Sequence, residues 1–146
     1  MWVIFEGLDK AGKGTLEREF LKAVNYEHII IDRGPVGYMT FDEIFKRRTV
    51  SRDETFIHKA SKIMASGDFM IVYCFADKNV IDKRLERHNE TCPYDYLKAQ
   101  EIYLNNVRRF YDGRKTLELD TTELPIDECI TLIIKKLQEV LKENEC

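Results

Sequence analysis

The chain has 146 residues, of which 44% are hydrophobic and 34% charged, and its formal net charge is −3. This length suits one domain spanning 1–146. The acidic balance excludes a protein whose main task is to grip a nucleic-acid backbone. No apolar run approaches the ~18 residues of a membrane helix. We therefore expect a soluble protein that binds neither nucleic acid nor membrane.

The N-terminus and the cysteines indicate where the protein works. MWVIFEGLDK lacks a basic region followed by a long apolar stretch, so no signal peptide is expected. The four cysteines, at positions 74, 92, 129 and 146, have no C-x-x-C spacing and form no recognisable zinc framework. We predict a cytoplasmic protein with reduced thiols and no disulfides.

Strands and helices alternate along the sequence. The apolar and β-branched runs predict strands at 2–6, 28–32, 69–75 and 115–120. Amphipathic spacing predicts helices at 13–25, 38–48, 52–66, 78–88, 94–111 and 125–143. The run 69–75 is apolar throughout and should be central. This order predicts an α/β fold, with a parallel sheet of about four strands covered by helices on both faces.

The apolar stripes of the last two helices predict which side chains face the core. For 94–111 these are Leu97, Ile102, Val107 and Phe110. For 125–143 they are Ile126, Ile130, Ile133, Leu137 and Val140 with Leu141.

The stretch GLDKAGKGT (7–15) directly follows the first strand and has the spacing G-x-x-x-x-G-K of a phosphate-binding loop. Gly7 and Gly12 let the backbone wrap closely enough for its amides to point at phosphate oxygens. The next helix adds its positive N-terminal end. Lys13 supplies a mobile charge for the β and γ oxygens. Gly14 occupies the place where most such loops have Ser or Thr, and the hydroxyl comes one residue later, at Thr15.

Two further segments follow strand ends, DRGPVG after the second strand and DTTELP after the fourth. Ligands of parallel sheets bind beyond the carboxyl ends of the strands. The three segments should therefore meet at one site.

FEGLDKAGKGT resembles the start of thymidylate kinases, F-E-G-x-D-x-x-G-K followed by Ser or Thr, while its G-K-G-T ending is similar to adenylate and uridylate/cytidylate kinases. The resemblance implies a P-loop kinase-like domain of the nucleoside monophosphate kinase group that uses ATP and Mg²⁺. It assigns the binding of the nucleotide cofactor to Gly7, Asp9, Lys10, Ala11, Gly12, Lys13, Gly14 and Thr15. In G-K-G-T loops the Thr helps to bind phosphate, so direct ligation of the metal by Thr15 is left open. Asp9 would lie near the acceptor sugar, the alternative being a turn-forming Asp.

Asp32 and Arg33 stand where thymidylate kinases have their Asp-Arg-Tyr motif. By that resemblance Arg33 holds the acceptor phosphate, and Asp32 orders Mg²⁺ through its waters. The chemistry fits, because Arg offers a planar fork to phosphate and a carboxylate suits hydrated Mg²⁺. Taken alone, the pair could simply end a strand before a Gly-Pro turn.

Arg84 and Arg87, in KRLER, resemble the arginines that flank the lid of these kinases, with a solvated helix face as the alternative. His88 is interpreted as a surface residue.

The chain also departs from the family: it is shorter, lacks the Glu-Pro-Gly segment that contacts the acceptor, and has Gly37 where Ser is common. Tyr38, Phe41 and Phe56 could stack on a base, but core packing is favoured for each.

The sequence is thus interpreted as an enzyme that transfers the γ-phosphoryl group of ATP-Mg to a (deoxy)nucleoside monophosphate. Lys13, Arg33, Asp32, Arg84 and Arg87 are the candidate catalytic residues. Two alternatives stay open: a deoxynucleoside kinase with Asp32 as the base, and a nucleotide-binding module without turnover. The sequence also leaves homodimer formation, the accepted base and the choice of ribose or deoxyribose open.

Overall fold

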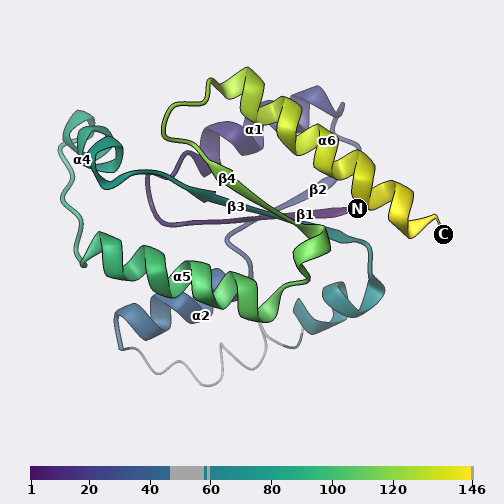
Figure 1. Cartoon of the computed structure of the whole chain (residues 1–146), viewed down its shortest axis with the longest axis horizontal. Coiled ribbons are helices and arrows are strands. Elements are labelled where there is room, and N and C mark those ends of the chain that lie inside the picture. The colour runs from purple at the N-terminus through teal and green to yellow at the C-terminus, as the bar shows by residue number, and fades with distance from the viewer. Residues whose placement is uncertain (47–57, 59, 146) are drawn as a thin grey trace.

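The computed structural model describes residues 1–46, 58 and 60–145 (Figure 1). In chain order the elements are β1 (Trp2–Glu6), α1 (Lys13–Ala23), β2 (Ile29–Asp32), α2 (Pro35–Ile44), β3 (Phe69–Phe75), α4 (Lys78–Arg87), α5 (Tyr96–Phe110), a short 3-10 helix (Gly113–Lys115), β4 (Thr116–Asp120) and α6 (Ile126–Asn144). Residues 60–66 are also helical. No described helix is long and apolar enough to cross a membrane.

The described strands form one parallel sheet in the order β2-β1-β3-β4. β1 and β3 are therefore central, as the solid apolar run 69–75 predicts. Because all the strands are parallel, their carboxyl ends lie at one edge of the sheet. The turn after β1 and the end of β2 are consequently neighbours, and Phe5 pairs with Asp32 in the register of the two strands.

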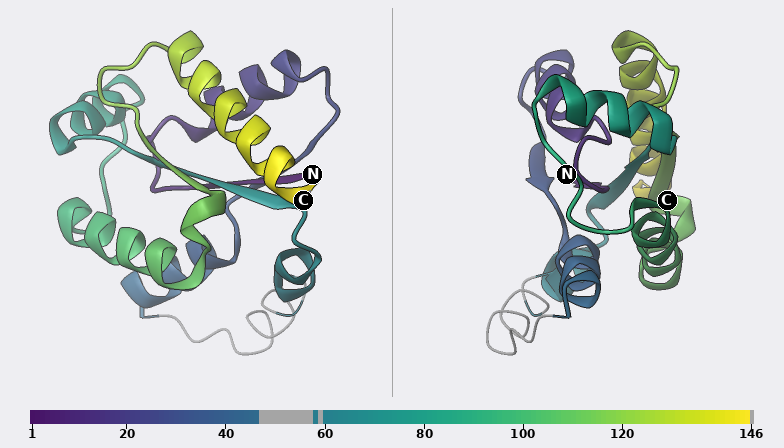
Figure 2. Two further views of the ribbon diagram at one scale, coloured as in Figure 1. Left: turned by 45° about the vertical axis from the view of Figure 1, so that its right-hand side comes forward. Right: turned by 90° about the vertical axis from the view of Figure 1, so that its left-hand side faces the viewer.

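Helices cover both faces of the sheet, which confirms the predicted architecture (Figures 1 and 2). Successive residues of the central strands point to opposite faces. Val3 and Phe5 of β1 pack in the core with α1 and α6. Ile4 of the same strand packs in the core with α2, α4 and α5. Each face thus has its own core, and both central strands are buried on two sides.

The predicted faces of α5 and α6 are partly wrong. Leu97 and Phe110 are 60% and 46% exposed, and α5 buries Tyr96, Ala99 and Tyr103 together with the predicted Val107. These four are spaced three and four apart. The stripe shifts because tyrosine rings, rather than the aliphatic residues beside them, fill this core. In α6, Ile126 and Leu141 are exposed, while Cys129, Ile130, Ile133, Leu137 and Val140 are buried.

The two ends of α2 also differ from the sequence prediction. α2 begins at Pro35 rather than at 38, since a proline at the first helical position already has helical φ and needs no amide partner. It ends at Ile44, before the predicted 48. Of the helix predicted over 52–66, the structure describes residue 58 and 60–66, so that Phe56 lies outside the described residues.

Candidate active site

The loop between β1 and α1 has the geometry of a phosphate cradle. Gly7 has φ 145° and Gly12 has φ 95°, backbone conformations that L side chains rarely adopt. α1 begins at Lys13, directly after Gly12, and no side chain caps its N-terminus. The first amides of the helix and its positive dipole end are thus available to an anionic ligand.

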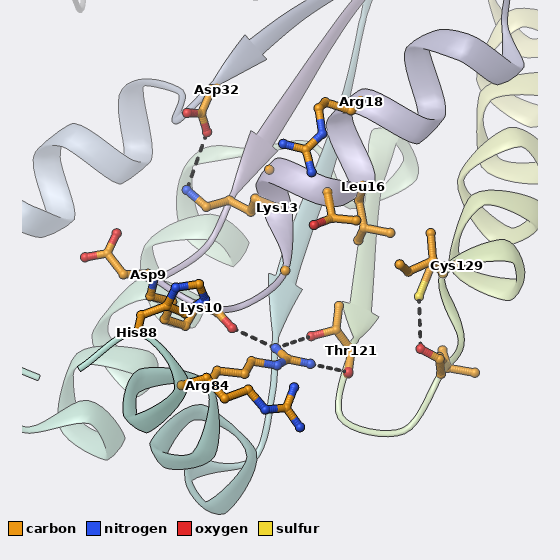
Figure 3. A pocket seen from close by; sticks show the side chains of 16 residues that line it. Asp9, Lys10, Lys13, Leu16, Arg18, Asp32, Arg84, His88, Thr121 and Cys129 are labelled. Carbon is orange, nitrogen blue, oxygen red and sulfur yellow. Dashed lines mark hydrogen bonds and ion pairs between the residues drawn. The ribbon is translucent and has the colours of Figure 1, made fainter. Parts of the chain in front are cut away.

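A pocket of about 620 Å³ opens over this loop (Figure 3). Its cations are Lys10, Lys13, Arg18, Arg84 and Arg87, and its carboxylates are those of Asp9 and Asp32. The rest of its lining is Gly12, Gly14, Thr15, Leu16, His88, Thr121, Leu124, Ile126 and Cys129. The structure therefore brings the phosphate loop, the end of β2, α4 and the segment after β4 to one cavity. The excess of cations suits a ligand with several negative charges.

Lys13 and Asp32 lie next to each other in the pocket lining (Figure 3). Lys13 Nζ lies 3.6 Å from Asp32 Oδ1, and the Lys13 side chain is 10% exposed. The ammonium group is thus held beside the loop, where a phosphate would reach it. Gly14 has open space around it, since an added Cβ would meet nothing within 4 Å. Sterics therefore do not explain why glycine stands there.

Glu17 is a functional candidate that the sequence interpretation missed. It lies one turn after Lys13 on α1, and its Oε1 is shielded from solvent with no hydrogen-bond partner among the described residues. Burial first, and then hydrogen bonding to Asp32 and the charge of Asp32, raise the pKa of Glu17 to about 8. Protonation of Glu17 would let it donate to the Asp32 carboxylate.

Carboxylate oxygens beside the phosphate loop fit hydrated Mg²⁺. No group of three or more His, Cys, Asp or Glu that could hold a metal ion occurs in the described part of the chain. A metal ion at Asp32 would therefore be held mainly by the phosphates of the ligand and by water. A site made by protein ligands alone does not fit these residues. Thr15 also lines the pocket.

Arg33 lies beside the pocket, and it is absent from the described lining. It has φ 59°, unusual for a residue with a side chain. Its guanidinium lies 4.1 Å from the centre of the Phe41 ring and 5.9 Å from that of Tyr38. It also contacts Asp9 at 3.4 Å, and Asp9 lines the pocket. Phe41 is 3% exposed, which confirms its packing role.

Arg84 contacts protein backbone around the pocket. Its Nη1 donates to the carbonyl of Lys10 at 2.7 Å, and its Nη2 to that of Thr121 at 2.9 Å. Burial lowers the pKa of Arg84. The Thr121 hydroxyl donates to the Ala11 carbonyl at 2.7 Å. Arg84 thus fixes the phosphate loop to the segment after β4, a role that the helix pattern alone does not indicate.

Arg87 and His88 line the pocket at the end of α4. Arg87 forms no ion pair with any other described residue, unlike Lys10, whose ammonium lies 3.3 Å from Glu90 Oε1. Of the two predicted lid arginines, Arg87 is therefore the one whose guanidinium is not already bound to backbone. His88, interpreted as a surface residue, is exposed and yet reaches the pocket edge.

Glu6 is a second residue that the sequence interpretation missed. It ends β1, has 0% exposure, and accepts hydrogen bonds from the amides of Gly34 and Gly37 and from the hydroxyl of Tyr111. Burial is the largest influence and raises its pKa to about 7, against the lowering effects of these donors and of Lys13. The sequence feature that could have indicated this buried carboxylate is a glutamate at the end of a strand that is otherwise apolar.

Comparison with known proteins supports the fold. No family model matches the chain, and no curated protein matches its sequence. Among solved structures, the YorR protein of Bacillus subtilis, crystallised in complex with phosphorylated GDP, matches with a TM-score of 0.69 at 22% sequence identity. The match covers 94% of this chain and 96% of that one. The chain thus shares the α/β fold of YorR over nearly its whole length.

Proposed function

We propose that the chain is an ATP-dependent kinase that transfers the γ-phosphoryl group to a (deoxy)nucleoside monophosphate. One observation carries this proposal: the loop after β1 and Asp32 at the end of β2 meet at one cationic pocket, with Lys13 Nζ 3.6 Å from Asp32 Oδ1 and Arg33 beside the pocket. A donor and an acceptor phosphate bound at these two places would be neighbours, which in-line transfer requires.

The donor side would bind the triphosphate of ATP. The backbone of the loop and the N-terminus of α1 offer amides to the β and γ phosphates, and Lys13 offers its ammonium. Thr15 adds a hydroxyl at the start of the helix. Mg²⁺, ordered by Asp32 through water, would neutralise charge on the transferring group.

The acceptor side would bind through Arg33. Its guanidinium carbon lies 4.1 Å from the centre of the Phe41 ring, and one of its nitrogens contacts Asp9, which lines the pocket. A fork of this kind matches a phosphate of the acceptor nucleotide. The chain would act by positioning and by stabilising charge through Lys13 and Arg87, with little covalent chemistry of its own.

YorR supports a nucleotide as the ligand, because its structure contains phosphorylated GDP and its fold extends over 94% of this chain. That complex is a property of YorR. It supports nucleotide binding by this chain because the pocket of this chain, taken by itself, also has several cations at the loop.

The decisive test is a panel in which ATP, Mg²⁺ and each nucleoside or nucleoside monophosphate are mixed with the protein and ADP release is followed. Turnover with a monophosphate supports the proposal. Turnover with nucleosides alone would instead identify a deoxynucleoside kinase, in which Asp32 takes the hydroxyl proton. Tight ATP binding without turnover on any acceptor would leave a nucleotide-binding module.

A further inference from the structure

The N-terminus of α2 is capped by a side chain from another element. Its N-cap residue is Gly34, which has no side chain to do this. The Glu6 carboxylate accepts the amide of Gly34 through Oε1 and that of Gly37 at 2.7 Å through Oε2. Helix N-termini normally obtain such acceptors from their own Ser, Thr, Asp or Asn. Here the acceptor comes from the end of β1.

The other groups near this first turn agree with a cap from β1. Pro35 has no amide hydrogen that needs a partner. The Tyr111 hydroxyl donates to Glu6 Oε2 at 3.2 Å, so it binds the same carboxylate as the two glycine amides. The arrangement also places a carboxylate at the positive end of the helix dipole.

This cap is continuous with the turn that carries Arg33. The Arg33 amide donates to the Phe5 carbonyl at 2.9 Å, and the next amide, that of Gly34, donates to Glu6. Two consecutive residues of β1 therefore hold the backbone on both sides of Arg33. Arg33 has φ 59°, a strained conformation that persists only where the surroundings enforce it.

The two glycines of this turn, Gly34 and Gly37, leave space that the Glu6 carboxylate and its neighbours occupy. A Cβ on Gly37 would lie 2.8 Å from Glu6 Oε1 and 2.6 Å from Arg33 Cγ. A Cβ on Gly34 would clash with Ile4 Cγ2 and would lie 2.9 Å from the Tyr111 hydroxyl and 3.1 Å from Glu6 Oε1. Glycine at these two places lets the buried carboxylate approach the backbone on which Arg33 depends.

We propose that Glu6 is a positioning residue of the acceptor side, which fixes the conformation of Arg33 by capping α2 from β1. This inference rests on the proposed function, in which Arg33 receives the acceptor phosphate. The charged and titratable groups that act on Glu6 come from several elements: Lys13 of α1, Tyr73 of β3, Tyr103 of α5 and Tyr111 after α5. Of these, Tyr111 touches it directly.

The first experiment measures acceptor and ATP kinetics for Glu6→Gln, with Glu139→Gln on the exposed side of α6 as the matched control. The amide keeps the shape but offers one acceptor oxygen, so one of the two glycine amides loses its partner. We expect the acceptor KM to rise by about tenfold or more, as the loss of a hydrogen bond to a charged group implies. The ATP KM should stay within about twofold, because the phosphate loop itself is intact.

The pH profile separates this role from general support of the fold. In the wild type, protonation of Glu6 removes one acceptor, so the acceptor KM should rise as the pH falls below about 7. In Glu6→Gln that rise should be absent, because an amide does not titrate in this range. An unchanged profile in the variant, or equal losses for both substrates, would overturn the proposal.

A double variant tests whether Glu6 acts through Arg33. In an Arg33→Gln background, Glu6→Gln should add less than about twofold to the acceptor KM, since coupled positions are not additive. Fully additive losses would overturn the proposal. Tyr111→Phe removes one donor to Glu6 and adds no atoms, so it should raise the acceptor KM by a smaller factor. This variant keeps the proposal testable if Glu6→Gln does not fold.

Amide hydrogen exchange keeps this inference distinct from the proposed function. If no phosphoryl acceptor is found, the proposed function fails, but the cap can still be tested. At least one of the Gly34 and Gly37 amides of Glu6→Gln should exchange at least about tenfold faster than in the wild type, while the amides of α6 keep their rates. Unchanged exchange at both glycines would overturn the cap itself.

Discussion

The ammonium group of Lys13 lies 3.6 Å from a carboxylate oxygen of Asp32, although one residue begins α1 and the other ends β2. The parallel pairing of β1 with β2 produces this contact, because it brings the loop after one strand beside the end of the other. A bound phosphate would compete with Asp32 for the ammonium, and a hydrated metal could take the carboxylate. The ion pair thus holds the ammonium group where a phosphate would bind and the carboxylate where a hydrated metal would bind.

Lys13→Ala should reduce kcat by on the order of 10²–10³, the range found when one preorganised transition-state donor is removed. ATP affinity should fall far less, because the loop amides and the N-terminus of α1 remain. Steady-state kinetics and ATP binding measured by calorimetry separate the two effects. Lys22→Ala, at the exposed end of the same helix, is the control. A nearly active Lys13→Ala would contradict the assignment of the loop.

The sequence indicated those parts of the site in which neighbouring residues act together. The loop GLDKAGKGT carries its own turn residues, its lysine and its helix start, so a local pattern suffices. The runs 2–6 and 69–75 match β1 and β3 residue for residue, since strands buried on both faces are continuously apolar.

The parts that the sequence did not reveal depend on distant partners. Glu6 contacts Gly34, Gly37 and Tyr111, which are 28, 31 and 105 positions away. Arg84 looked like one of two equivalent lid arginines, and only the fold shows that its guanidinium is bound to Lys10 and Thr121 backbone. The periodicity of a helix gives no sign of which carbonyl groups will lie opposite.

Gly37→Ser should destabilise the protein, because a Cβ at this position would lie 2.6 Å from Arg33 Cγ and 2.8 Å from Glu6 Oε1. Overpacking of this kind costs about 1–3 kcal/mol, which urea unfolding would measure. Gly113→Ala is the control, since its Cβ would meet nothing within 4 Å. Equal stability of the two variants would show that the turn can move away from Glu6.

The stability of the fold should decrease as the pH rises from about 4.5 to about 7, because Glu6 binds its proton more tightly in the folded chain than in the unfolded one. Raising the pKa from 4.5 to about 7 sets an upper limit of roughly 3 kcal/mol for this loss. Glu17, whose pKa is raised to about 8, acts in the same direction. Urea unfolding at several pH values should therefore show a flatter profile for Glu6→Gln than for the wild type. Parallel profiles would contradict the assignment to Glu6.

Arg84→Gln and Arg87→Gln should behave differently, although the residues lie one turn apart on α4. Losing the Arg84 guanidinium leaves the carbonyls of Lys10 and Thr121 without their donor, a cost of about 1–3 kcal/mol in unfolding free energy. Arg87→Gln should keep its stability and lose turnover, because its guanidinium has no described ion pair. Thermal unfolding together with kcat distinguishes the two, and matching effects would refute the division of roles.

Arg33→Lys should raise the acceptor KM although the positive charge is kept. Lysine lacks the planar fork that can bind a phosphate through two donors, and it would lose the contact of the guanidinium with the Phe41 ring, whose centre lies 4.1 Å away. The loss of one charge-assisted hydrogen bond predicts a change of about tenfold. Arg108→Lys is the matched control, because Arg108 pairs with Glu118 on the surface, away from the pocket. Arg33→Lys could also keep the acceptor KM of the wild type while an acceptor is turned over. That result would show that a residue other than Arg33 binds the acceptor phosphate.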